Sequence, residues 1–251
     1  MIRHSTIPLV LHKIVQDGAG RQFEDIEISM FQKILETCQG RCLSLDKVNI
    51  CQRLPGKSFL LTFDDGFSSD YESVFPLLQQ MDCLATFFLT TDNVGANGFV
   101  SWAQVRELHN AGMTIGSHSR THPDMRCLTL SRQREELLSS RLCLEDKLGS
   151  AVTAFSFPFG RFDMDLVRLA WDAGYHTVGT SLHGVTQLPS SLLPRNSING
   201  SMTWESVSQI LKAVPLTRVK WLVEDVTKNS FRAITGDSMY RTLRDILTNR
   251  K

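Results

Sequence analysis

The chain lacks an excess of charge of either sign. It has 27 Lys and Arg residues against 26 Asp and Glu residues, with a formal net charge of +1 and a pI near 7.7. This balance argues against electrostatic capture of nucleic acid or of an anionic membrane. The sequence also lacks blocks of like charge, low-complexity tracts and internal repeats. The composition is therefore that of a globular protein. The chain has 251 residues, is 42% hydrophobic and is long enough to bury a sizeable core.

The amino-terminal segment lacks a long hydrophobic run. Its longest non-polar stretch, Ile7 to Leu11, has five residues, which is too short for a secretory signal core or a membrane span. The six cysteines are scattered without zinc-ribbon spacing, which favours reduced thiols over a disulfide framework. We therefore expect a cytoplasmic protein without a transmembrane segment. The sequence leaves the oligomeric state open.

Buried strands and amphipathic helices alternate along most of the chain. The expected strands cover residues 8–15, 57–63, 83–90, 113–118, 152–158 and 175–181. The expected helices cover residues 29–38, 71–81, 101–112, 131–149, 164–174 and 201–214, with N-cap candidates at Ser101, Ser131 and Thr203. This order predicts parallel strands joined by helical crossovers. A distorted β/α barrel fits it, and an open doubly wound sheet is the alternative.

Polar or turn-forming segments lie at the ends of three of the predicted strands or directly after them. They are Asp64-Asp65, the pair His118 and His122, and the segment 157–160. Each has an ordinary interpretation, because Asp-Asp-Gly is a common turn and histidines four apart occur in polar loops. Their positions favour a site, because the carboxyl ends of parallel strands converge on one face of the sheet.

The residue types at these strand ends fit metal-assisted hydrolysis. One carboxylate and two imidazoles are a common catalytic zinc set that leaves a position for water. A second, unbound carboxylate can accept the proton of that water. Zinc is the preferred ion for these ligand types, and cobalt, nickel or iron fit the same set.

Three motifs in this chain resemble those of a known family. "LTFDDG", "SHSRTHPD" and "FSFPFG", in this order, are similar to the polysaccharide deacetylase family, which is also known as the NodB-homology domain or carbohydrate esterase family four. Segments such as "IPLVLHKIV", "ATFFLTTDNVG" and "LPRNSI" resemble its exopolysaccharide-type branch. The resemblance covers roughly residues 7 to 200. It implies a distorted (β/α)7-8 barrel, a divalent metal, and hydrolysis of carbon–nitrogen bonds other than peptide bonds in N-acetylated sugars.

The resemblance assigns roles residue by residue. Asp64 corresponds to the general base. The metal ligands correspond to Asp65, His118 and His122. The substrate groove corresponds to Pro158, Phe159 and Gly160, whose aromatic position offers a backbone N–H to the tetrahedral oxyanion.

The chain departs from the family pattern at two of these motifs. Ser156 stands where the family usually has an arginine that steadies the catalytic aspartate. Arg195 is our preferred replacement and Arg161 is the next, while a purely structural arginine is the alternative. In "TSLHG", His183 is the candidate general acid, although the usual spacing between leucine and histidine is altered. A loop histidine without a catalytic role is the alternative there, and the family's Asp–Trp motif has no clear match.

These features predict a barrel over residues 1–200 and a C-terminal helical extension over residues 201–251, packed on the same domain. The expected activity is removal of an N-acetyl group from an amino sugar, an oligosaccharide or a polysaccharide. One alternative is a related hydrolase acting on a non-sugar amide or a formyl group. Another is a catalytically silent carbohydrate-binding relative, which the altered motifs suggest.

Overall fold

A parallel sheet lies at the centre of the molecule. The computed structural model describes residues 5–19, 22–47, 57–213 and 223. Within that part of the chain the main sheet has nine strands, in the order β10-β9-β8-β7-β6-β5-β1-β11, with β4 also paired to β5. The strands are β1 (Ser5–Leu11), β4 (Cys42–Leu43), β5 (Lys57–Asp65), β6 (Thr86–Leu89), β7 (Thr114–Ser117), β8 (Ala154–Ser156), β9 (Thr177–Gly179), β10 (Leu192–Leu193) and β11 (Asn196–Ser197).

The two outer strands of this path, β10 and β11, are joined by only two residues, Pro194 and Arg195. Strand β10 pairs with β9, whereas β11 pairs with β1 on the opposite edge. The sheet must therefore curl until its two edges meet, and Arg195 lies at this seam. The predicted distorted barrel is confirmed, and the open doubly wound sheet is wrong.

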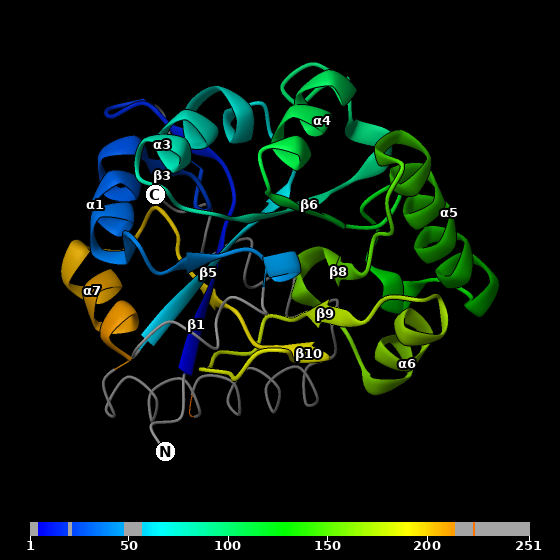
Figure 1. The fold of residues 1–251 in the computed structure, drawn as a ribbon. Helices are drawn as coiled ribbons and strands as arrows, with labels where there is room; N and C mark the ends of the chain where they lie inside the picture. The colour runs from blue at the N-terminus through cyan, green and yellow to red at the C-terminus, as the bar shows by residue number, and fades with distance from the viewer. Residues whose placement is uncertain (1–4, 20–21, 48–56, 214–222, 224–251) are drawn as a thin grey trace.

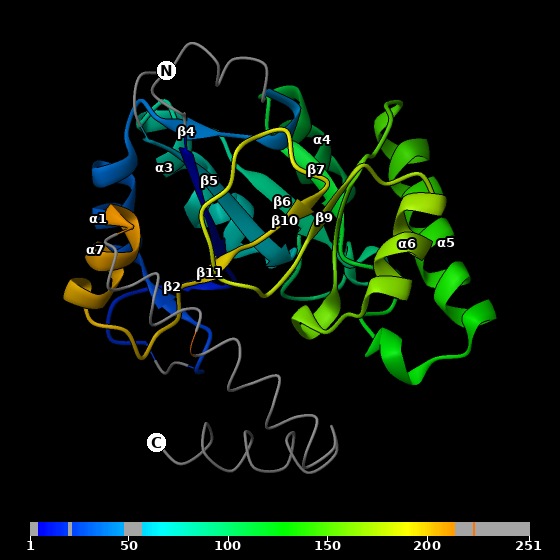
Figure 2. The same cartoon turned by 90° about the horizontal axis from the view of Figure 1, so that it is seen from below.

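Helices surround the curled sheet (Figures 1 and 2). They are α1 (Ile28–Cys38), α3 (Phe75–Gln80), α4 (Trp102–Asn110), α5 (Leu130–Leu148), α6 (Met164–Asp172) and α7 (Trp204–Lys212). A π-helical turn, η2 (Asp70–Val74), leads into α3. The remaining short elements are β2 (Ile14–Val15), β3 (Ile26–Glu27), η1 (Leu45–Lys47), η3 (Thr91–Asn93), η4 (Met125–Cys127) and η5 (Pro158–Gly160).

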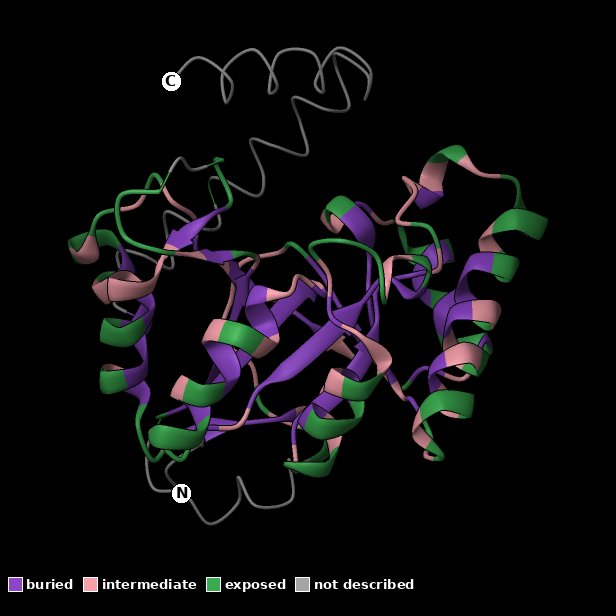
Figure 3. Ribbon diagram, turned by 90° about the horizontal axis from the view of Figure 1, so that it is seen from above, coloured by how far each residue is buried: buried purple, intermediate pink, exposed green. Residues whose placement is uncertain are grey.

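The side chains of β5 point alternately to the helix-covered core and to the barrel interior. Phe63 stacks on Phe87 of β6, with ring centroids 5.1 Å apart, and meets Phe31 of α1 edge-on at 5.7 Å. Because successive side chains on a strand point to opposite faces, Thr62 and Asp64 face the barrel interior instead. The burial map shows the same division, with buried strands inside and exposed residues on the outer helix faces (Figure 3).

Two of the three predicted N-caps are confirmed. The side chain of Ser101 accepts a backbone hydrogen bond at the start of α4, and that of Thr203 does so at the start of α7. The prediction for Ser131 is wrong, because α5 begins at Leu130 and Thr129 occupies the cap position without a side-chain bond. Ser131 therefore lies inside the first turn, where its hydroxyl is not a cap.

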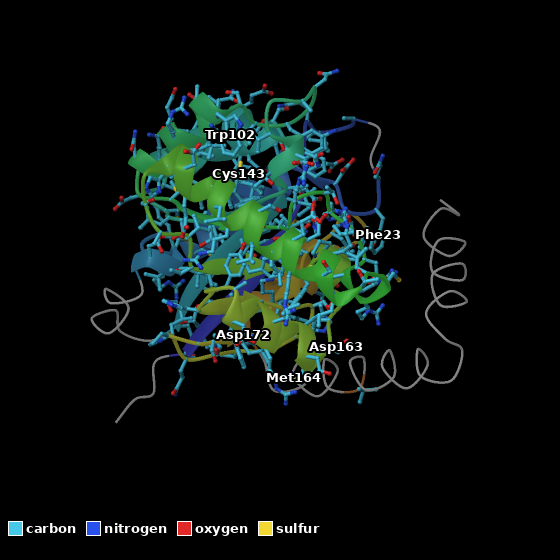
Figure 4. All side chains as sticks on the ribbon, turned by 90° about the vertical axis from the view of Figure 1, so that its right-hand side faces the viewer. Phe23, Trp102, Cys143, Asp163, Met164 and Asp172 are labelled. Carbon is cyan, nitrogen blue, oxygen red and sulfur yellow. The ribbon has the colours of Figure 1, made fainter. Side chains whose placement is uncertain are left out.

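The outer helices present mainly polar residues to solvent. Figure 4 views the side formed by α5 and α6, with Cys143 on α5, Asp163 and Met164 at one end of α6, and Asp172 at the other. Asp163 caps α6 by accepting a hydrogen bond from the backbone N–H of Leu166 at 2.8 Å. Among the described helices, none is long and apolar enough to cross a membrane.

Helix α7 represents the described part of the predicted C-terminal extension. It lies beside α1 (Figures 1 and 2), and the ammonium group of Lys57 donates to the carbonyl of Lys212 at its end. Residues 214–251, apart from Val223, lie outside the described residues. The division into a barrel over 1–200 and an extension over 201–251 therefore stays a prediction.

Candidate active site

The aspartate pair lies at the carboxyl end of β5. Neighbouring residues of a regular strand point to opposite faces, but Asp65 has a left-handed backbone with φ of 79°. Both carboxylates consequently reach the same imidazole. Nε2 of His118 lies 3.9 Å from Oδ2 of Asp64 and 3.5 Å from Oδ1 of Asp65.

The three predicted metal ligands meet at this point. Nε2 of His122 lies 3.2 Å from Oδ1 of Asp65, and the possible ligand atoms of Asp65, His118 and His122 all lie within 4.8 Å of one another. Two imidazole nitrogens and one carboxylate oxygen are a suitable donor set for zinc. The residues therefore fit a divalent metal.

His118 is held in the protonation state that a metal ligand needs. Its Nδ1 lies 2.8 Å from the carbonyl oxygen of Ser156, which can only accept, so Nδ1 carries the hydrogen. Burial lowers the pKa of His118 to about 4, although the carboxylates of Asp64 and Asp65 act in the opposite direction. At neutral pH the imidazole is uncharged, and the lone pair of Nε2 faces the aspartates.

Glu136 of α5 fixes the loop between the two histidines, and the sequence analysis did not identify it. Its side chain is 2% exposed. Oε2 accepts hydrogen bonds from the backbone N–H groups of Arg120 and Thr121, both at 2.9 Å, and Oε1 accepts from the Thr121 hydroxyl at 2.8 Å. The available signal was an acidic residue on the buried face of a long amphipathic helix.

Buried serines complete this support. The hydroxyl of Ser119 accepts from the backbone N–H of His122 at 3.0 Å, and the hydroxyl of Ser117 accepts from that of Ser119 at 3.2 Å. Ser119 and His122 have φ values of 67° and 59°. Left-handed backbone at non-glycine residues costs about 1–3 kcal/mol each and persists only where the surroundings fix it. These hydrogen bonds help to hold the strained loop in place.

Arg195 binds the Asp64 carboxylate with both of its terminal nitrogens. Nη1 lies 2.6 Å from Oδ1 and Nη2 lies 2.8 Å from Oδ2. Nη2 also donates to the Ser156 hydroxyl at 2.6 Å, and that hydroxyl donates to Oδ2 at 3.1 Å. Ser156 therefore touches both the Asp64–Arg195 pair, through its hydroxyl, and His118, through its carbonyl.

The pairing with Arg195 decides the charge of Asp64, whose side chain is 4% exposed. Burial alone would raise the pKa of Asp64, but the charge and hydrogen bonds of Arg195 outweigh it and hold the pKa far below its ordinary value. Burial also opposes ionisation of Asp65, and the bond to His122 lowers its pKa overall. Both aspartates are carboxylates at neutral pH.

The other candidate arginine lies elsewhere. Nη1 of Arg161 binds Oδ2 of Asp124 at 2.8 Å, and its guanidinium lies over the Phe159 ring at 5.4 Å. Of the two candidates, the structure brings Arg195, and not Arg161, to Asp64. Space for Arg195 exists because Gly179 has no side chain, and a Cβ there would lie 3.0 Å from its Nε.

The predicted groove segment, Pro158–Gly160, forms the short turn η5 beside the histidines. The Phe159 ring is 48% exposed and meets the His122 ring at 4.6 Å between centroids. Gly160 has φ of 60°, and a Cβ there would lie 2.3 Å from Cβ of Ser181. The structure thus brings this segment to the candidate metal site.

His183 lies in the segment between β9 and β10. That segment reaches the seam, because the backbone N–H of Arg195 donates to the carbonyl of Leu182 at 2.7 Å. The structure therefore brings the peptide group before His183 to the backbone of Arg195 at the seam. The catalytic role of the His183 side chain stays a prediction.

A further acidic residue, Asp70, was missed by the sequence analysis. It is fully buried at the start of η2, and neither carboxyl oxygen has a hydrogen-bond partner among the described residues. Burial raises the pKa of Asp70 well above its ordinary value, and the charges of Asp65 and Asp64 raise it further. Only its position after the aspartate motif could have drawn attention to it.

Comparisons with known proteins identify relatives of this chain. The YxkH protein of Bacillus subtilis (strain 168) is 28% identical over 135 residues, which are 54% of this chain and 46% of that relative. The chain thus spans about half the length of this relative. The peptidoglycan-N-acetylglucosamine deacetylase of Bacillus cereus is 24% identical over 202 residues, which are 74% of this chain and 69% of that protein.

A solved structure has the same fold. The Streptococcus pyogenes deacetylase PplD, in complex with acetate, superposes with a TM-score of 0.72 at 25% identity, covering 82% of this chain and 97% of that one. The sequence model of the family described as polysaccharide deacetylase matches residues 52–178, which include both aspartates and both histidines. With half of the chain matched in this way, the protein belongs to the polysaccharide deacetylase family.

Proposed function

We propose that this chain is a metal-dependent hydrolase that removes an N-acetyl group from an amino sugar within an oligosaccharide or polysaccharide. The observation that carries the proposal is the convergence of Asp65, His118 and His122 beside the Asp64 carboxylate that Arg195 holds. The names of two relatives, a peptidoglycan-N-acetylglucosamine deacetylase and a deacetylase in complex with acetate, support an acetylated substrate.

In this proposal Asp65, His118 and His122 hold the metal. When bound, a divalent ion polarises a carbonyl group and lowers the pKa of water, which supplies a nucleophile at neutral pH. Zinc is preferred for this donor set, and cobalt, nickel or iron are compatible with it. The neutral state of His118 supports metal binding because its Nε2 lone pair is available.

Asp64 then accepts the proton of the attacking water. Its low pKa keeps it ionised across the working pH range, and the bidentate arginine fixes its orientation. Phe159 contributes its backbone N–H to the oxyanion, with Pro158 and Gly160 shaping the groove beside it. His183 donates a proton to the leaving amine as the carbon–nitrogen bond breaks.

The silent carbohydrate-binding alternative loses part of its motivation. It was suggested by the missing arginine at position 156, and Arg195 supplies a guanidinium to the same carboxylate from the segment between β10 and β11. A pure binder would gain nothing from a buried, arginine-bound carboxylate next to three metal-ligating groups. Hydrolysis is the function that uses all of these features.

Turnover of an acylated panel, comparing wild type with Asp64→Asn, tests the proposal. The panel contains N-acetylglucosamine oligomers, an N-acetylated non-sugar amide and an N-formyl compound, each with added zinc or cobalt. We expect acetate release from the sugar oligomers and a loss of about 10²–10⁴-fold in Asp64→Asn with metal still bound, because a general base contributes that much.

The control is Asp165→Asn, on the exposed surface of α6, which we expect to match wild type. Full activity in Asp64→Asn contradicts the general-base assignment. Turnover of only the non-sugar or formyl compounds would instead favour the related hydrolase.

A cytoplasmic location also stays a prediction. In the cytoplasm, a soluble, nucleotide-linked or lipid-linked amino sugar or an oligosaccharide is a more natural substrate than a secreted polymer.

A further inference from the structure

Asn196 is a fully buried amide at the seam of the barrel, directly after Arg195. Its Nδ2 donates to the carbonyl of Pro8 and to the carbonyl of Gly184, both at 2.8 Å. Its Oδ1 accepts from the backbone N–H of Gly184 at 3.0 Å. Both amide hydrogens and one oxygen lone pair are used, so the side chain is fixed in one orientation.

The partners of Asn196 and Arg195 flank His183 on both sides. Asn196 binds Gly184, the residue after His183, at both its N–H and its carbonyl. The backbone N–H of Arg195 binds the carbonyl of Leu182, the residue before His183. The peptide groups around His183 are therefore tied to two consecutive residues of the seam.

These two residues are themselves rigidly placed. Asn196 belongs to β11 and pairs with Leu9 of β1, so its backbone is part of the main sheet. The Arg195 side chain binds both oxygens of Asp64 on β5. The dipeptide Arg195-Asn196 thus contacts both proposed catalytic groups. The Arg195 side chain binds the proposed base, Asp64, while the Arg195 backbone N–H and the Asn196 side-chain amide bind the segment that carries the proposed acid, His183.

We propose that Asn196 is a positioning residue that sets His183 at a fixed place relative to Asp64. This inference rests on the proposed function, in which His183 protonates the leaving amine. Asn196 acts on His183 through the backbone of Gly184. Without its side chain, the N–H and carbonyl of Gly184 lose their partner, and the segment directly after His183 loses this anchor.

The effect of misplacing His183 depends on the leaving group of the substrate. When an amide is cleaved, the carbon–nitrogen bond breaks as His183 gives its proton to the nitrogen, because an amine anion is a very poor leaving group. When 4-nitrophenyl acetate is cleaved, the carbon–oxygen bond breaks and 4-nitrophenolate leaves without protonation. A misplaced acid therefore slows amide cleavage and leaves ester cleavage unchanged.

The experiment measures kcat and KM of the metal-loaded enzyme on an N-acetylglucosamine oligomer and on 4-nitrophenyl acetate. The variants are Asn196→Ala, Asn196→Asp, His183→Ala and the double variant Asn196→Ala/His183→Ala. The matched control is Ser58→Ala, which removes another buried hydrogen bond on β5, to Thr6 of β1 at 2.8 Å, at the far end of the strand from Asp64.

We expect Asn196→Ala to lower kcat on the oligomer by about 10²-fold, the effect of misplacing a reacting group by about 1 Å. KM and the ester reaction should stay close to wild type. Asn196→Asp keeps the volume and the bond to the Gly184 N–H but loses both donated bonds, so it should show the same selective loss. In the His183→Ala background, Asn196→Ala should cost nothing more.

Equal losses on both substrates, or additive losses in the double variant, would overturn the proposal and leave a purely structural role. Failure of the proposed function gives a different result. In that case wild type releases no acetate from the oligomer, or Asp64→Asn retains activity. Full amide activity in His183→Ala would refute the acid assignment and the positioning role together.

Discussion

The two sides of the site are held in different ways. On one side, His118 and His122 come from a single short loop, which Glu136 fixes from the neighbouring helix α5. On the other side, Arg195 reaches Asp64 across 131 positions of sequence, at the seam where β10 and β11 meet. The histidine loop is thus built and held locally, whereas the seam side exists only when the barrel has closed.

Each side relies on a buried carboxyl group whose two oxygens both accept hydrogen bonds. Glu136 is surrounded by three donors, and Asp64 by a bidentate arginine and a hydroxyl. A buried charge is tolerated when its partners are in place and becomes costly when one is removed. Single substitutions on both sides should therefore have large effects. At the seam the effect is measured as folding stability, and at the histidine loop as metal affinity.

The largest effect is expected at the seam, from Arg195→Ala. This change leaves the Asp64 carboxylate buried without its cation, and breaking a buried pair costs about 3–5 kcal/mol of folding free energy. Urea unfolding of the metal-free protein measures that cost. Activity should fall as well, because the base loses its fixed orientation.

Two further variants test whether the lone carboxylate is the cause. Adding Asp64→Asn to Arg195→Ala should restore part of the lost stability, since it removes the unpaired charge. Arg168→Ala, at an exposed ion pair on α6, should leave stability almost unchanged. If Arg195→Ala destabilised the protein no more than Arg168→Ala, the seam would not depend on this pair.

On the ligand side, Glu136→Ala should weaken metal binding. The backbone N–H groups of Arg120 and Thr121 lose their acceptor, and the loop between the two histidines loosens. Outer partners of metal ligands typically change affinity by about 10–100-fold. Competition with a coloured chelator measures the metal Kd, and Glu136→Gln should be intermediate because its amide retains one acceptor oxygen.

Glu135→Ala is the matched control for this change. Glu135 is the neighbouring residue but is exposed, and it contacts the Arg120 side chain instead of the loop backbone. We expect it to bind metal as wild type does. An unchanged Kd in Glu136→Ala would show that the histidine loop holds its shape without the buried carboxylate.

The same difference explains what the sequence could reveal. The ligand side was predictable because Asp65, His118 and His122 lie at strand ends within recognisable short motifs. Helix periodicity likewise predicted α1, α4 and α6 to within a few residues. Arg195 could be proposed only through the family resemblance, because nothing in local spacing links it to a residue 131 positions away.

Other features had no local signal at all. Strands β4, β10 and β11 have two residues each, too few for any periodic pattern, yet β10 and β11 form the seam. The roles of Glu136 and Asn196 depend on backbone groups of distant segments, which carry no sequence signature. The sequence shows that Ser156 differs from the family pattern, but only the folded barrel shows that Ser156 contacts both His118 and Asp64.

The smallest predicted effect concerns Asp70, the buried acid that lacks the partners found on both sides of the site. Its folded-state pKa is raised, so it stays protonated after the unfolded chain has ionised. Below the ordinary carboxyl pKa of about 3.9 it contributes nothing to pH dependence. Above that value the folded state binds more protons than the unfolded chain, so this residue lowers stability as pH rises.

Asp70→Asn should remove this pH-dependent loss. Urea unfolding of metal-free wild type and variant at pH 5 and pH 8 should show the variant gaining stability relative to wild type at the higher pH. Part of the raised pKa comes from the charges of Asp65 and Asp64, so a divalent ion held by Asp65 should shrink the difference. Identical pH dependence in the two proteins would mean that Asp70 has a partner in solution, and the contrast between paired and unpaired acids would then disappear.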